Sequence, residues 1–136
     1  MTQVPRRPAV RARALCWVVG TDDLDAVVAA SPVDLGEVVH FTRGDRSWRL
    51  TVPADGHLPW GGLLPAFIEW SPGPHPSAAQ QDLGVRLDKV QISHPDPASC
   101  RQALDTLQVG HLADVVEGEA ALSFHLTGPS GAAVVD

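Results

Sequence analysis

The feature that most constrains this chain is a pattern of elements that occurs twice. In the first half, the apolar run at residues 14–20 is followed directly by a helix predicted over 21–31. In the second half, the strand-like run at 87–93 is followed by a helix predicted over 94–107. Acidic residues open the first helix and prolines open the second, and both suit a helix N-terminus. A repeat of this kind predicts two similar modules that pack against each other.

Each predicted helix is followed by three predicted strands. Along residues 46–53, Trp48, Leu50 and Val52 alternate with polar residues, as in a half-buried strand. The predicted strands cover 37–44, 46–53 and 63–70 in the first half and 113–118, 119–129 and 132–136 in the second. The pattern therefore predicts an α+β protein built from two βαβββ modules.

The module boundaries follow from composition. We expect module one over 13–70, a linker rich in Pro, Ser and Gly over 71–84, and module two over 85–136. Together they form one domain over 13–136, which agrees with the chain length of 136 residues. Residues 1–12 contain several arginines and are predicted to be a flexible basic tail.

Neither half is large enough to cover its own sheet. We therefore expect the modules to pack side by side as one curved mixed sheet, with helices on the convex face. The concave face would be a cup, which is a natural site for a small-molecule ligand. The alternative is a sandwich of eight strands with no cup.

Charge and hydropathy restrict the partners. The formal net charge is −6 and the pI is near 5.3, whereas nucleic-acid-binding proteins usually carry a basic face. No apolar run approaches the roughly 18 residues that span a bilayer. The run at 14–20 is short for a signal peptide, so we expect a cytoplasmic protein with no nucleic-acid or membrane partner. Cys16 and Cys100 fit neither a disulfide framework nor a CxxC motif.

Four stretches are characteristic: SWRLTVPADGHLPWGGLLPAFIEW, HPS, GVRLDKVQISHPDP and TGPSGAAV. They resemble the glyoxalase-like domain family of the vicinal oxygen chelate superfamily, from about residue 13 to the C-terminus. Members of that superfamily include isomerases, extradiol dioxygenases, epimerases, thiol transferases that open epoxides, and drug-binding proteins. The resemblance thus implies the βαβββ fold and does not specify a reaction.

The resemblance also implies where a metal would bind. In metal-using members, ligands come from the first and last strands of each module and converge in the cup. The matching positions are Cys16, Glu69, Lys89 and Val135, or Asp136 if the register shifts by one residue. A structured site needs at least three N, O or S donors, and an ammonium group cannot accept a metal. Glu69 and Cys16 are therefore weak metal candidates, and we predict no cofactor, with a divalent metal as the alternative.

Lys89 is the only lysine of the chain. If strand alternation holds, it faces the same side as Glu69, so we predict an ion pair between them inside the cup. The alternatives are that Glu69 binds a metal ion or faces solvent.

Other side chains are candidates for the same cup. Trp60 lies in the loop HLPWGG, at the expected mouth, where an aromatic ring can stack on a ligand; loop packing is the alternative. His40 and His125 lie on strands of the two modules and could act as donor or base, or be structural. His75 and His94 each precede a proline, which predicts structural turn roles.

Three functions follow as hypotheses. The leading one is a metal-independent small-molecule-binding protein, whose candidate ligand-binding residues are Glu69, Lys89, Cys16, Trp60, His40 and His125. The second is a metal-dependent lyase, isomerase or dioxygenase of the glyoxalase type, with Glu69 as metal ligand or general base, so whether the chain is an enzyme stays open. The third is an interaction module whose sheet edges form a homodimer.

Overall fold

The structure is a computed structural model of the chain, and it describes residues 12–136. The basic tail predicted over 1–12 therefore lies outside the described residues, apart from Ala12. In chain order the elements are β1 (Val18–Gly20), α1 (Leu24–Ala30), β2 (Glu37–Arg43), β3 (Arg46–Val52), the 3-10 helix η1 (Pro59–Gly62), β4 (Ala66–Trp70), the 3-10 helix η2 (Pro76–Ala79), β5 (Arg86–His94), α2 (Pro97–Thr106), the 3-10 helix η3 (Gly110–Leu112), β6 (Ala113–Glu117), β7 (Ala121–Gly128) and β8 (Gly131–Val135).

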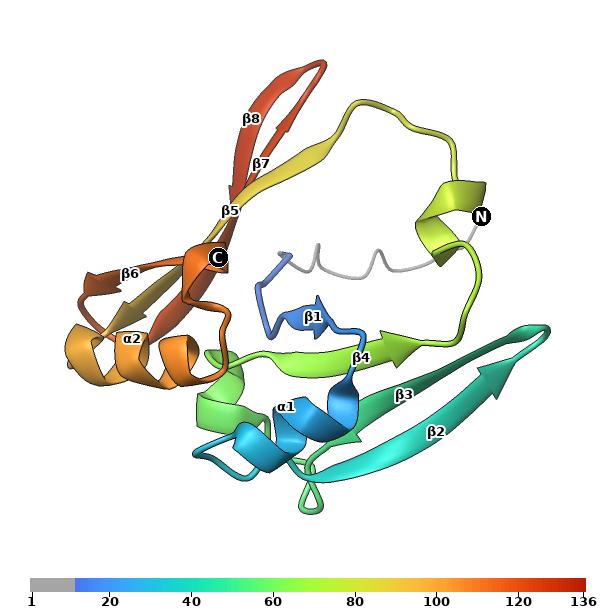
Figure 1. The fold of residues 1–136 in the computed structure, drawn as a ribbon. Coiled ribbons are helices and arrows are strands. Elements are labelled where there is room, and N and C mark those ends of the chain that lie inside the picture. The colour runs from blue at the N-terminus through green and yellow to red at the C-terminus, as the bar shows by residue number, and fades with distance from the viewer. Residues whose placement is uncertain (1–11) are drawn as a thin grey trace, which may run out of the picture.

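The α+β class and the two βαβββ modules are confirmed. The strand order is β1-β4-β3-β2 in module one and β6-β5-β7-β8 in module two. Each sheet contains one parallel pair, β1 with β4 in module one and β5 with β6 in module two, and the other pairs are antiparallel. Figure 1 shows α1 lying over the sheet of module one and α2 beside β5 and β6.

The strands form two four-stranded sheets where one continuous sheet was expected. Of the run at 14–20, only Val18–Gly20 is regular strand. The indole N–H of Trp17 donates to the carbonyl of Leu63 at 2.9 Å, and the backbone N–H of Ala14 donates to the carbonyl of Asp136 at 3.3 Å. The bond from Ala14 to Asp136 ties the segment before β1 to module two.

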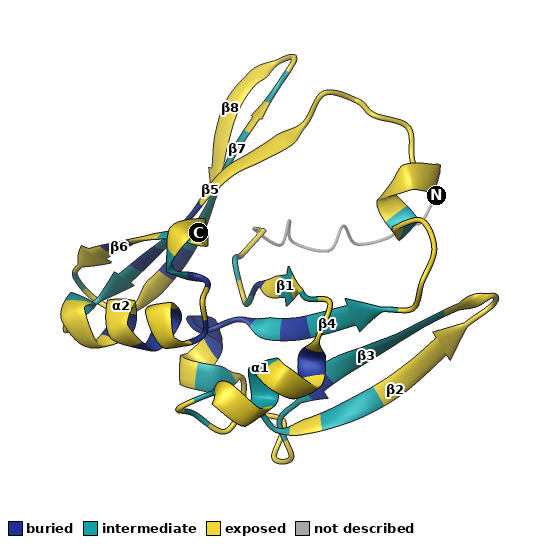
Figure 2. Cartoon of the chain, viewed as in Figure 1, coloured by how far each residue is buried: buried dark blue, intermediate teal, exposed yellow. Residues whose placement is uncertain are grey.

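One hydrophobic core serves both modules. It joins Leu24 and Phe67 of module one to Val90, Ile92 and Leu104 of module two. Figure 2 shows buried segments gathered around the start of β4, the inner side of α2 and β5. Both helices start with an aspartate cap, since Asp23 and Asp96 accept backbone N–H groups three residues on. No helix in the part of the chain that the structure describes is long and apolar enough to cross a membrane.

Candidate functional site

Glu69 points toward helix α1. Its Oε2 accepts the backbone N–H of Leu24 at 2.7 Å and a bond from the Arg49 guanidinium at 3.0 Å. Arg49 also donates to both carboxylate oxygens of Asp25, at 3.1 and 3.2 Å. These groups come from β4, β3 and α1, and we call Asp25, Arg49 and Glu69 the helix clamp. The side chains of Arg49 and Glu69 are half-buried, at 32% and 24% exposure, whereas that of Asp25 is 72% exposed.

The clamp keeps Glu69 ionised. The hydrogen bond from the Leu24 backbone, and then the bonds from Arg49, lower the pKa of Glu69 below its usual value. Bonds to Asp25 and then to Glu69 raise the pKa of Arg49. A carboxylate with a lowered pKa is a weak proton acceptor near neutral pH, so this geometry does not favour Glu69 as a general base.

The predicted ion pair between Glu69 and Lys89 is wrong. The Lys89 ammonium lies 3.5 Å from a carboxylate oxygen of Asp114 on β6. Glu69 pairs in register with Arg49, which places both on the face that α1 covers. The prediction failed because alternation relates the side chains of one strand to each other, whereas Glu69 and Lys89 lie on strands of two different sheets.

The uncovered face of the first sheet, opposite α1, is apolar. Its rings form a row across three strands: Phe41 lies 5.8 Å from Trp48, Trp48 lies 5.1 Å from Trp70, and Trp70 lies 5.5 Å from His75. Trp70 also lines two hollows, of about 580 and 380 Å³. His40 does not lie on this face, because it pairs with Arg49 and shares its side of the sheet.

The uncovered face of the second sheet is polar. Lys89 pairs in register with His125, and the His125 ring lies 3.4 Å from the hydroxyl of Ser123. The structure thus brings Lys89 and His125 together and leaves Cys16, His40 and Glu69 apart from them. Whether any of these side chains contacts a ligand stays a prediction.

The residues at the family's metal positions do not fit an ion. Glu69 is held by two donors, Lys89 is a cation, and Val135 offers no donor. Cys16 is half-buried and is one thiol where at least three donors are needed. Among the described residues there is no group of three or more His, Cys, Asp or Glu side chains that could hold a metal ion.

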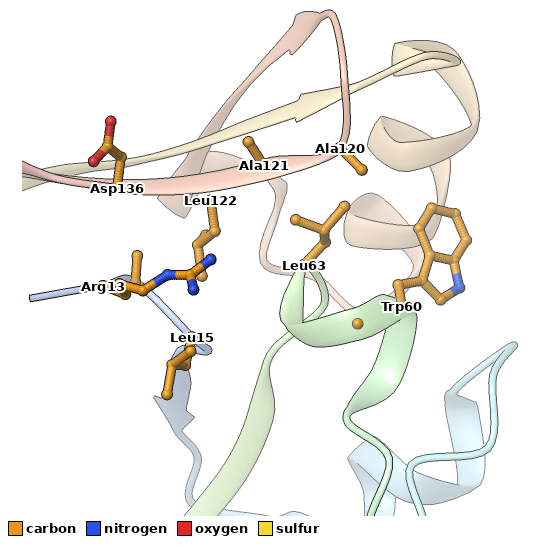
Figure 3. Close-up of a pocket in the computed structure, with 10 residues that line it drawn as sticks. Arg13, Leu15, Trp60, Leu63, Ala120, Ala121, Leu122 and Asp136 are labelled. Carbon is orange, nitrogen blue, oxygen red and sulfur yellow. The ribbon is translucent and has the colours of Figure 1, made fainter. Parts of the chain in front are cut away.

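A pocket of about 760 Å³ lies where the segment before β1, η1 and the start of β7 meet (Figure 3). Its walls include the side chains of Leu15, Leu63 and Leu122, and Arg13 supplies a guanidinium. Gly62 is needed here, because a Cβ at that position would lie 2.1 Å from the carbonyl oxygen of Leu15. That close approach keeps the segment before β1 against η1.

Trp60 lines the rim of this pocket, and the sequence placed it at a mouth. Its backbone is left-handed, with φ 51° and ψ 38°, which costs a residue with a side chain about 1–2 kcal/mol. Its ring lies 5.4 Å from that of His94. Strain of this kind in a half-exposed aromatic residue is typical of positions kept for a function.

The turn roles predicted for His75 and His94 are confirmed. Each Nδ1 accepts the backbone N–H two residues further on, at 3.1 Å for Ser77 and 3.0 Å for Asp96. Neither Arg49 nor Arg13 was expected at a site. Arg49 alternates with Trp48 along β3, and this signal could have placed it on the same face as Glu69.

Comparison with known proteins identifies the family of this chain. A model of the glyoxalase-like domain family matches residues 4–108, which include all of module one and the first strand and helix of module two. The chain belongs to the glyoxalase-like domain family. Its two βαβββ modules give this glyoxalase-like domain a fold of the vicinal oxygen chelate type. No curated protein and no solved structure matches it significantly.

Proposed function

We propose that this glyoxalase-like domain binds a small organic molecule without a metal ion. The observation that carries the proposal is the helix clamp, in which Arg49 and the Leu24 N–H occupy the carboxylate of Glu69. Lys89, at another metal-ligand position of the family, is a cation beside Asp114. The same observations favour binding over a glyoxalase-type reaction that uses Glu69 as ligand or base.

The pocket at Trp60 is the binding site in this proposal. Small-molecule sites are concave, mostly apolar, and about 300–1,000 Å³ in volume, with a few polar groups that orient the ligand. The pocket of about 760 Å³ has leucine walls, an indole at its rim and one guanidinium, so it matches this description.

The test combines metal analysis with a binding titration. Purified, untagged protein is incubated with zinc, nickel, manganese and iron, dialysed and analysed for each element. The same protein is titrated with N-phenyl-1-naphthylamine, a flat neutral fluorescent probe, with and without EDTA. We expect metal content well below one ion per chain and saturable probe binding with a Kd of the order of 0.1 mM, unchanged by EDTA.

Two outcomes would overturn the proposal. One is retention of about one ion per chain, which would require a donor set other than the one described. The other is the absence of saturable probe binding by folded protein. The variant Glu69→Gln serves as the matched control, because the proposal gives Glu69 no contact with the probe, so its Kd should equal that of the wild type.

A further inference from the structure

We infer that the pocket at Trp60 selects an organic anion, in which a flat apolar body carries one negative group that pairs with Arg13. This inference rests on the proposed function, because it names the ligand class of the same pocket. It depends on the direction of one guanidinium, on the apolar walls around it and on the shape of the rim.

Arg13 is the positive group of the pocket. Figure 3 shows its side chain extending from the segment before β1 toward Leu122, on the side of the pocket where Leu63 also lies. Within residues 12–136, no ion pair to the Arg13 guanidinium is found. Arg13 is exposed, so its guanidinium is accessible to a ligand that enters the pocket from solvent, and a guanidinium forms charge-assisted hydrogen bonds with carboxylate or sulfonate oxygens.

Asp136 also lines the pocket, but its carboxylate does not oppose an anion at Arg13. In Figure 3 that carboxylate points away from the space that Arg13 and Leu122 share. Its backbone carbonyl accepts the N–H of Ala14, which holds the neighbour of Arg13 in place. In this view the guanidinium and the carboxylate point in different directions.

The remaining walls suit a flat apolar body. Leu15 lies at the lip of the pocket and is 67% exposed. Burial of such an exposed apolar side chain under a ligand is energetically favourable. Trp60 and Gly61 are both left-handed, at φ 51° and 66°, and form a tight rim. The ligand class that fits this arrangement is an aromatic or polycyclic carboxylate or sulfonate.

The experiment uses two probes that share one ring system. 1-Anilinonaphthalene-8-sulfonate carries an anionic group, and N-phenyl-1-naphthylamine is the same molecule without it. We expect the wild type to bind the anion about 3- to 10-fold more tightly at low salt. Arg13→Gln should abolish this preference, so that the ratio of the two Kd values falls to about one. The matched control Arg43→Gln removes the same charge from an exposed position in the β2–β3 hairpin and should behave as the wild type.

The salt dependence of probe binding tests the same ion pair on the wild-type protein, without a variant. The preference for the anion should fall between about 0.05 and 0.5 M salt, while the Kd of the neutral probe stays or improves. Near-UV circular dichroism at each condition confirms that the protein is native, since partly folded proteins also bind this anion.

The outcomes separate the two proposals. If wild-type protein binds both probes equally, or if Arg13→Gln keeps the full preference for the anion, the assignment of an anion is wrong and the binding function stands. If native protein binds neither probe, the proposed function is wrong as well.

Discussion

Arg49 is the residue on which the geometry around Glu69 depends. It donates to Asp25 on α1 and to Glu69 on β4, so one guanidinium ties the helix to two strands. A carboxylate that satisfies an N-terminal N–H and a guanidinium together is a stabilising group, and its energy depends on ionisation.

Glu69→Gln should therefore lower stability at neutral pH and have less effect in acid. The folded-state pKa of Glu69 lies below its usual value of 4.5, so its contribution is complete above about pH 4.5. It is lost as the pH falls through the lower folded-state pKa. The urea denaturation midpoints of the wild type and the variant, measured from pH 7 to pH 3, should converge as the pH falls. A difference between the two midpoints that stays the same at every pH would exclude an ionic role for Glu69.

Trp60 allows a test of stored strain. In a left-handed conformation, glycine avoids the cost that a Cβ carries, so Trp60→Gly should be more stable than Trp60→Ala by about 1 kcal/mol. The two variants lose the same ring, and their difference isolates the backbone. Denaturant midpoints measure it, and equal stabilities would mean that the loop relaxes when the indole is removed.

At the scale of elements, Trp48 connects strands β2 and β4. Its ring lies against Phe41 on one side and Trp70 on the other, on a half-exposed face. Trp48→Ala should destabilise the protein by about 1–3 kcal/mol, because two ring contacts and their buried area are lost. Thr42→Ala, at an exposed position of the same hairpin, is the control and should change stability by less than about 0.5 kcal/mol. Thermal denaturation measures both, and equal effects would show that the row does not support the sheet.

The whole molecule offers a test of module coupling, because all four tryptophans lie in module one, over residues 13–70. Leu104 of α2 is fully buried in the shared core. Leu104→Ala should cost about 2–5 kcal/mol and should shift the unfolding midpoint seen by tryptophan fluorescence as far as that seen by far-UV circular dichroism. Separate midpoints for the two signals would instead mean that the modules unfold independently.

Local signals were sufficient for much of this fold. The repeat, the helix starts after two apolar runs and the alternation of Trp48, Leu50 and Val52 led to the right elements in the right order. These signals rest on the fixed periods of helix and strand, which act within a few residues. The turn roles of His75 and His94 were predictable for the same reason, since each imidazole bonds two residues away.

Contacts between distant residues were not predictable in this way. Glu69 and Lys89 seemed to face each other, but their partners are Arg49 and Asp114, which the strand registers select. Arg13 was not expected at a site, and it lines the pocket in a segment where Ala14 and Trp17 bond to Asp136 and Leu63.

By itself, the sequence determined the α+β class, the two βαβββ modules and the family, because these follow from local periodicity and characteristic motifs. Only the tertiary structure decided which face Glu69 occupies, that the strands form two sheets, and where the pocket lies. The physical reason is that a shift of one residue in register reverses a face, and that register depends on contacts between residues far apart in the sequence.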